Sequence, residues 1–178
     1  FYLHMISEFD YQNPKLVAEI GCNHKGDINI AKRIIEIAAQ SKVDIVKFQK
    51  RNNKELLTQE QYSAPHPNPM HSYGLTYGEH REFLEFNLEQ HKDLKQYTES
   101  LELIYSSSVW DVTSAQEILS LNPEFIKVPS ACNNNFEILR LLRDKYDGEV
   151  HISFGMTTKA EEEDIVNCFE EKKQSQRL

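Results

Sequence analysis

The sequence predicts an α/β fold, specifically a (β/α)8 TIM barrel of which this chain supplies about five βα units. Short apolar runs of strand length alternate five times with longer stretches of helical periodicity. Polar residues, several of them lysines and serines, recur where the apolar runs end. Barrel enzymes carry their catalytic groups at the carboxyl ends of several strands. A doubly wound open sheet is the alternative, but no Gly-x-Gly-x-x-Gly follows the first strand, so its dinucleotide-binding form loses support.

The first core strand is predicted over residues 15–20, after a turn at Asn13-Pro14, and residues 1–9 are a candidate for a short preceding strand. Its apolar run is typical of a parallel strand covered on both faces, but Glu19 interrupts it. A buried carboxylate is costly unless it is paired or hydrogen-bonded. Glu19 therefore belongs either to a structural ion pair or to a polar site at the end of the strand.

A helix is predicted over residues 28–40, with Asp27 as its N-cap. Its apolar face is formed by residues at helical spacing, namely Ile30, Ala31, Ile34, Ile37 and Ala38. A second strand follows over residues 43–49. Lys47 and Gln49 share one side-chain parity, so both point to the face that would be the interior of a barrel. For Lys47 the alternative is a side chain that extends into solvent from the end of the strand.

Residues 50–78 show no clean period and contain the proline-rich segment 65–69, which predicts a long functional or mobile loop. Thr76 and Glu79 have capping-box spacing and predict one helix over residues 79–100. Its expected buried stripe comprises Phe83, Phe86 or Leu84, Leu88, Leu94 and Tyr97.

Three further units complete the predicted pattern. Strands are expected over residues 101–107, 124–128 and 150–153. The first is followed by a helix to Leu121, capped by Asp111 or Thr113, and the second by a helix over residues 133–146 that ends at Asp147-Gly148. The last helix begins after Thr157 or Thr158 and carries Ile165, Val166 and Phe169.

The composition limits the function classes. The 178 residues are 39% hydrophobic and 27% charged, which is typical of a globular domain. A net charge of −8 argues against nucleic-acid binding, and no apolar run is long enough to span a membrane. The three cysteines are too few for a disulfide framework, and no Cys/His spacing resembles a zinc site. These features predict a cytoplasmic protein.

The polar residues at strand ends predict an anion site. Two lysines and several hydroxyls that converge at one barrel mouth are suited to a phosphate, with backbone N–H groups at helix N-termini as further donors. Any one serine alone is more typical of a cap or a turn. Glu19 in the same mouth leaves room for proton transfer or for hydrogen bonds to a polyhydroxylated substrate. The candidate residues are Glu19, Lys47, Gln49, Ser108, Lys127, Ser130 and Ser153.

Several ordered segments resemble the sialic acid synthase family, which includes the N-acetylneuraminate, legionaminate and pseudaminate synthases. Residues 17–26, Val-Ala-Glu-Ile-Gly-Cys-Asn-His-Lys-Gly, resemble the opening of that family, and Val-Lys-Phe-Gln at 46–49 its second-strand motif. Residues 73–80, 126–130 and 153–156 are similar to later family motifs in the same order. The resemblance extends over nearly the whole chain.

The resemblance implies a barrel enzyme that condenses phosphoenolpyruvate with the open-chain aldehyde of a 2-acetamido-sugar, such as N-acetylmannosamine. It implies that Glu19 and Gln49 face the sugar. It further implies a divalent metal, Mn²⁺ or Mg²⁺, that polarises the aldehyde, and a homodimer. By the same resemblance, phosphoenolpyruvate is held by Lys47, Ser108, Lys127, Ser130 and Ser153.

The sequence also departs from that family. Cys132 stands where many members carry an acidic residue, so the identity of the sugar stays open. The family's metal-binding histidines, its last barrel strands and its antifreeze-like domain are expected beyond residue 178, so residues 1–178 are interpreted as the N-terminal portion of the synthase barrel, inactive by itself. His24, His80 and His151 are expected to be structural or solvated. Two alternatives remain: a Schiff-base aldolase that uses Lys47 or Lys127, and an inactive truncated domain that binds sugar or phosphate.

Overall fold

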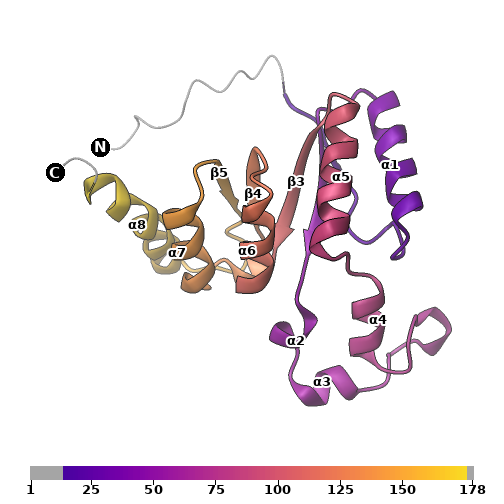
Figure 1. Ribbon diagram of the computed structural model, residues 1–178. Helices are drawn as coiled ribbons and strands as arrows, with labels where there is room; N and C mark the ends of the chain where they lie inside the picture. The colour runs from indigo at the N-terminus through magenta and orange to yellow at the C-terminus, as the bar shows by residue number, and fades with distance from the viewer. Residues whose placement is uncertain (1–13, 176–178) are drawn as a thin grey trace.

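The computed structural model describes residues 14–175; the strand considered for residues 1–9 lies outside them. Five parallel strands form one sheet in the order of the chain (Figure 1). They are β1 (Val17–Glu19), β2 (Ile45–Lys50), β3 (Ile104–Val109), β4 (Phe125–Val128) and β5 (Glu149–Ile152). A doubly wound sheet reverses its strand order at a switch point, whereas a barrel wall does not. The sequential order therefore confirms five βα units of a barrel and excludes the doubly wound alternative.

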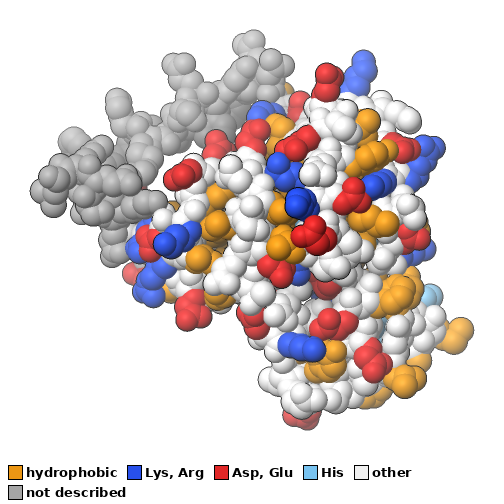
Figure 2. All heavy atoms as spheres, viewed as in Figure 1, with side chains coloured by type: hydrophobic (Ala, Val, Ile, Leu, Met, Phe, Trp, Pro, Cys, Tyr) orange, Lys and Arg blue, Asp and Glu red, His pale blue; other side chains and the backbone are white. Residues whose placement is uncertain are grey.

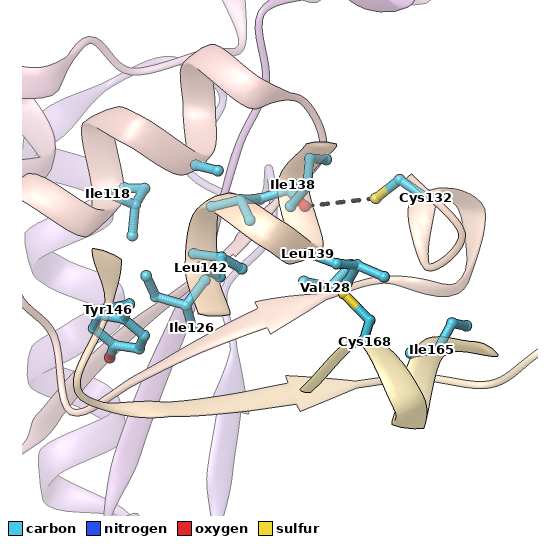
Figure 3. Close-up of a cluster of buried hydrophobic side chains, with 12 residues drawn as sticks. Ile118, Ile126, Val128, Cys132, Ile138, Leu139, Leu142, Tyr146, Ile165 and Cys168 are labelled. Carbon is cyan, nitrogen blue, oxygen red and sulfur yellow. Dashed lines mark hydrogen bonds between the residues drawn. The ribbon is translucent and has the colours of Figure 1, made fainter. Parts of the chain in front are cut away.

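The long helices form an outer layer over one face of the sheet (Figure 1). They are α1 (Ile28–Gln40), α5 (Leu88–Ser100), α6 (Val112–Ser120), α7 (Phe136–Lys145) and α8 (Lys159–Ser175), and consecutive members contact each other. Two buried clusters join this layer to the sheet, one between β1–β3 and α1/α5, the other between β3–β5 and α6–α8. Figure 3 shows the second, in which Ile165 and Cys168 of α8 lie near Val128 and Leu139.

Strand alternation separates the two faces. On β2, Val46 and Phe48 are fully buried beneath the helices, while Lys47 and Gln49 point to the opposite face. This second face is the one that becomes the interior when a barrel closes. The charged residues in the strands are therefore compatible with burial of the apolar ones, because the two sets occupy different faces.

Helix α1 matches its predicted bounds, and Asp27 caps it by accepting hydrogen bonds from the amides of Asn29 and Ile30. The predicted apolar face is wrong in part, because Ile30 and Ile37 are 40% and 49% exposed. The residues that face the sheet are Ala31, Ile35 and Ala38. The apolar arc of this helix is wider than the surface that β1, β2 and α5 cover, so its margins stay accessible.

The segment predicted as one loop contains several short helical elements: α2 (Asn53–Leu56), α3 (Gln59–Ser63) and the 3-10 turn η1 (Pro69–His71). Helix α4 (Tyr77–Phe83) begins at its end. The capping box of Thr76 and Glu79 is confirmed, but the single helix over 79–100 is wrong. The chain leaves helical geometry after α4, and Asn87 forms a second capping box with Gln90 that begins α5. Of the predicted stripe, Leu84, Phe86 and Leu94 are buried, whereas Phe83 is 50% exposed.

The last three units follow the prediction more closely. Asp111 caps α6, Asn135 caps α7, and Thr158 and Glu161 form reciprocal hydrogen bonds at the start of α8. On α8, Ile165 is buried and Val166 is exposed. Within residues 14–175, no helix has both the length and the apolar character that crossing a membrane requires.

Candidate functional site

Most of the predicted site residues lie in two rows across the interior face of the sheet. Gln49 of β2, Ser108 of β3 and Lys127 of β4 are paired in register on consecutive strands. Glu19 of β1 is in register with Lys47 of β2, which lies two residues before Gln49 on the same strand. Because residues in register on parallel strands point to the same face, five of the seven predicted residues share one surface.

Glu19 and Lys47 form an ion pair of 2.8 Å between Oε2 and Nζ. The Lys47 side chain is 17% exposed and that of Glu19 is 49% exposed. The ion pair that was one of the two predictions for Glu19 is present. Its carboxylate also lies on the interior face, where the polar site of the other prediction is expected. A half-exposed pair contributes little to stability, which leaves Lys47 available to exchange its partner for another anion.

The charges of Glu19 and Lys47 both affect the pKa of Lys127. Burial lowers the pKa of Lys127 and the Lys47 ammonium lowers it further, whereas Glu19 and Cys132 act in the opposite direction. The ammonium groups of Lys47 and Lys127 thus both lie near the Glu19 carboxylate on this face of the sheet. An anion bound there would stabilise the protonated form of Lys127.

Ser130 and Ser153 lie at the neighbouring ends of β4 and β5. Ser130 belongs to the 3-10 turn η2 (Ser130–Cys132), and its Oγ accepts a hydrogen bond of 3.2 Å from the Gly155 amide. Ser153 continues the ladder by donating its amide to the Val128 carbonyl at 3.1 Å, and the Asn133 side chain binds the Ser153 carbonyl at 2.8 Å. These contacts hold both serines at the carboxyl edge of the sheet, the same edge toward which Gln49, Ser108 and Lys127 lie.

One residue of this edge was missed by the sequence analysis. Arg51 follows Gln49 by two positions, and its Nη2 donates a hydrogen bond to the Gln49 Oε1. The guanidinium also pairs with Glu85 at 3.2 Å and lies 4.4 Å from the ring centroid of Trp110. The shared parity of Lys47, Gln49 and Arg51 was the available signal, but the contacts with Glu85 and Trp110 depend on tertiary structure.

A polar cavity of about 220 Å³ lies next to the carboxyl end of β2 and is lined in part by Arg51. Lys50 Nζ pairs there with Glu117 Oε2 at 2.9 Å, and Arg51 pairs with Glu85. Its basic groups are therefore already ion-paired, as Lys47 is on the interior face, but there Lys127 adds a second ammonium group. The interior face is therefore the better candidate for an anion. The cavity is lined by Lys50, Arg51, Asn52, Asn53, Glu82, Glu85, Phe86, Asn87, Thr113 and Glu117.

Cys132 does not offer an ionised group to this site. Its thiol is buried and points to the carbonyls of Val109 and Pro129, each 3.6 Å away. Figure 3 shows one of these two contacts of Cys132 as a dashed line. Burial, reinforced by the Asp111 carboxylate, raises the pKa of the Cys132 thiol to about 12. A buried neutral thiol at this position packs into the core, so it cannot replace the charge of an acidic residue.

The histidines considered in the sequence have structural contacts. His24 is buried, stacks on Phe86 with ring centroids 4.0 Å apart and accepts a hydrogen bond from the Gly26 amide. Burial lowers the pKa of His24 to about 4, so its ring is neutral at pH 7. His80 stacks against Tyr73, and His151 contacts Glu149 at 3.0 Å.

The metal implied by the resemblance can be tested against the donor groups. Within residues 14–175, no three His, Cys, Asp or Glu side chains lie together in a way that could hold a metal ion. Of the acidic residues on the interior face, Glu19 is ion-paired with Lys47, and Glu149 of β5 contacts His151 at 3.0 Å. These residues do not form a metal site by themselves.

The chain is similar to known proteins in both sequence and structure. The NeuB family profile matches residues 34–178. The N-acetylneuraminate-9-phosphate synthase of Mus musculus is 38% identical over 124 residues, covering 70% of this chain and 34% of that protein. The N,N'-diacetyllegionaminic acid synthase of Campylobacter jejuni is 30% identical over 152 residues, covering 85% of this chain and 45% of that protein.

Solved structures agree with this relationship. The N-acetylneuraminic acid (sialic acid) synthetase of Leptospira borgpetersenii, in complex with citrate, superposes with a TM-score of 0.73 at 26% identity, covering 90% of this chain and 52% of that one. A DAHP synthase of Thermotoga maritima, at a TM-score of 0.56 and 9% identity, shares the fold. The chain thus spans between a third and a half of the length of these sialic and legionaminic acid synthases. Since the profile matches most of its residues, the chain belongs to the NeuB family.

Proposed function

We propose that this protein condenses phosphoenolpyruvate with the open-chain aldehyde of a 2-acetamido-hexose, giving a nonulosonic acid and phosphate. C3 of phosphoenolpyruvate attacks the aldehyde carbon, water adds at C2, and phosphate leaves by cleavage of its C–O bond. The named relatives, which are synthases of sialic and legionaminic acids, support this assignment. The single observation that carries it within the chain is the pair of lysines, Lys47 and Lys127, on the interior face of the sheet.

In this proposal, different residues at the interior face and its carboxyl edge bind the two substrates. The phosphate and carboxylate of phosphoenolpyruvate bind to Lys47, Lys127 and the hydroxyls of Ser108, Ser130 and Ser153. Glu19 and Gln49 face the sugar. When the anion arrives, Lys47 turns from Glu19 to phosphoenolpyruvate, and the released carboxylate accepts a hydrogen bond from a sugar hydroxyl.

The remainder of the active site is proposed to come from other parts of the protein. Residues 1–178 would form the N-terminal portion of the catalytic barrel, followed by further strands, the metal ligands for Mn²⁺ or Mg²⁺ and an antifreeze-like domain. We also propose that the full-length protein is a homodimer and is located in the cytoplasm. Partial coverage of the relatives supports it, together with the sheet edges, where Leu16 and Val17 next to β2 are about half exposed.

The test is a phosphate-release assay of the natural full-length protein with phosphoenolpyruvate, N-acetylmannosamine and Mn²⁺. We expect release that requires both substrates, and phosphoenolpyruvate labelled with ¹⁸O at its C2–O bridge should deliver the label to phosphate. Lys47→Met and Lys127→Met should each raise KM for phosphoenolpyruvate at least about tenfold, since a charge-assisted contact contributes about 1.5–3 kcal/mol. Lys145→Met, on the exposed end of α7, is the matched control. Label retained in the organic product would refute the proposed bond cleavage.

A Schiff-base aldolase is the second candidate, because the lowered pKa of Lys127 is the direction that amine catalysis requires. Borohydride reduction in the presence of a keto-acid or aldehyde separates the two reactions. The synthase forms no imine, so the mass of the protein should stay unchanged. A covalent adduct lost in Lys127→Met would favour the aldolase, and ligand binding without turnover would favour an inactive binding domain.

A further inference from the structure

We propose that Arg51 is a positioning residue that fixes the Gln49 amide so that its NH2 group, and not its oxygen, is presented to the sugar. The inference rests on the proposed function and deepens it, because it assigns a direction to one hydrogen bond of the sugar site. Arg51 itself is not one of the residues proposed to contact phosphoenolpyruvate or the sugar.

The side chain of Arg51 is held from three directions. Its Nη2 donates to Gln49 Oε1, and its Nη1 pairs with Glu85 Oε1 at 3.2 Å, while its backbone amide donates to Glu85 Oε2 at 3.1 Å. Its guanidinium lies over Trp110 with 4.4 Å between the guanidinium carbon and the ring centroid. The side chains of Arg51 and Glu85 are 9% and 8% exposed, so their ion pair is largely removed from solvent.

Burial makes this arrangement rigid. Glu85 lies in the linker between α4 and α5, Trp110 follows β3, and Arg51 follows β2, so the guanidinium joins three separate segments. Burial raises the pKa of Glu85, and Arg51 acts against that shift as its largest opposing influence. The guanidinium therefore has a defined position from which to orient Gln49, because moving it would leave the Glu85 carboxylate buried without its main partner.

The orientation of the Gln49 amide follows from the chemistry of Arg51. A guanidinium has five N–H donors and no acceptor, so only the amide oxygen can face it. The Gln49 Nε2 consequently points away from Arg51. It lies 3.5 Å from the position that a Cβ atom would occupy on Gly21. Gly21 has φ of +56°, which favours glycine, and it lies two residues beyond Glu19 at the end of β1. Gln49 thus offers donors, and its ligand must be an oxygen acceptor of the acetamido-sugar.

Lysine cannot replace Arg51 in this role. A guanidinium contacts Gln49, Glu85 and the Trp110 face at once through its planar fork, whereas an ammonium is a compact point charge. Arg51→Lys preserves the charge next to Glu85 but should release the Gln49 amide. Lys50→Arg is the matched control, since Lys50 is the neighbouring cation, pairs with Glu117 and points to the other face of the sheet.

The experiment is a double-mutant cycle in the natural full-length protein, with KM measured separately for N-acetylmannosamine and for phosphoenolpyruvate. Arg51→Lys and Gln49→Ala should each raise the sugar KM about tenfold, the loss expected for one charge-assisted or well-placed hydrogen bond, and leave the phosphoenolpyruvate KM within about twofold. In the Gln49→Ala background, Arg51→Lys should change the sugar KM by less than about twofold, because coupled residues are not additive. The control should leave both values near wild type.

A second variant tests the direction of the hydrogen bond. Gln49→Glu keeps the contact with Arg51 but carries no donor, so its sugar KM should rise as far as that of Gln49→Ala. A Gln49→Glu enzyme with wild-type sugar KM would overturn the assigned direction. Additive effects of Arg51→Lys and Gln49→Ala, equal rises in both KM values, or a lowered Tm with unchanged KM would each overturn the positioning role. Absence of turnover in the wild type would overturn the proposed function and this inference with it.

Discussion

Asp111 allows a stability prediction to be worked out from individual contacts. It is 4% exposed and caps α6, with its Oδ1 accepting a hydrogen bond from the Ser114 amide at 2.7 Å. Its Oδ2 accepts two more, from the Ser114 hydroxyl at 2.8 Å and from the Asn52 amide at 2.7 Å. The last contact connects α6 to the end of β2, so Asp111 is both a cap and a link between two βα units.

The expected cost of Asp111→Ala has two parts. Loss of an N-cap costs about 1 kcal/mol. The unpaired Asn52 amide and Ser114 hydroxyl add about 1–3 kcal/mol, because buried groups without partners lose their hydrogen bonds to water as well. Asp27→Ala is the matched control, since Asp27 caps α1 at an exposed site and accepts only from Asn29 and Ile30.

The assay is equilibrium unfolding in urea, followed by far-UV circular dichroism. We expect the free energy of unfolding to fall by about 1 kcal/mol in Asp27→Ala. In Asp111→Ala it should fall by about 2–4 kcal/mol, with the m-value unchanged. Equal losses in the two variants would refute the reasoning, because the link to Asn52 would then contribute nothing beyond the cap.

Three further predictions concern the core and its titrating groups. Leu94→Ala, at a fully buried position of α5, should lower the free energy of unfolding by about 2–5 kcal/mol in the same urea assay, and a loss below 1 kcal/mol would show that the cavity closes. Burial lowers the pKa of His24 to about 4 and of His91 to about 3, below the unfolded value of 6.5. Their neutral forms therefore stabilise the fold above pH 6.5, and this contribution should be lost as pH falls from 6.5 toward 4 and 3; an unfolding free energy that stays constant from pH 7 to 5 would contradict it. Iodoacetamide at pH 8 should label the half-buried Cys22 before Cys132, whose thiol pKa is raised to about 12, and mass spectrometry of the digested protein would reveal the reverse order.

Local signals in the sequence were sufficient for the elements whose ends are set by capping residues. Asp27 defined the start of α1 correctly, and the alternation around Lys47 separated the two faces of β2. The continuous helix over residues 79–100 was wrong because the apolar spacing continues across the break, while Asn87 and Gln90 form a capping box that competes with it. Apolar periodicity alone does not show whether a second helix begins at Asn87 or the helix that begins at Thr76 continues.

The candidate site was predictable for a similar reason. Residues at the ends of parallel strands converge without any knowledge of the loops, so Gln49, Ser108 and Lys127 could be grouped from parity and order alone. Arg51 and Glu85 could not, because 34 residues separate them in the chain and the linker that carries Glu85 was expected to be helical. A contact between a strand end and an unpredicted break in a helix is visible only in the folded structure.

The sequential strand order also has a consequence for how the chain folds. Every strand pairs with the strand next to it in the sequence, and consecutive helices contact each other, so most tertiary contacts join adjacent βα units. Forming contacts between units that are near in sequence costs little chain entropy, because the connecting segments are short. The connection between β2 and β3 is the longest of these segments. We therefore expect each unit to associate with its predecessor as it leaves the ribosome, before the later strands have been synthesised.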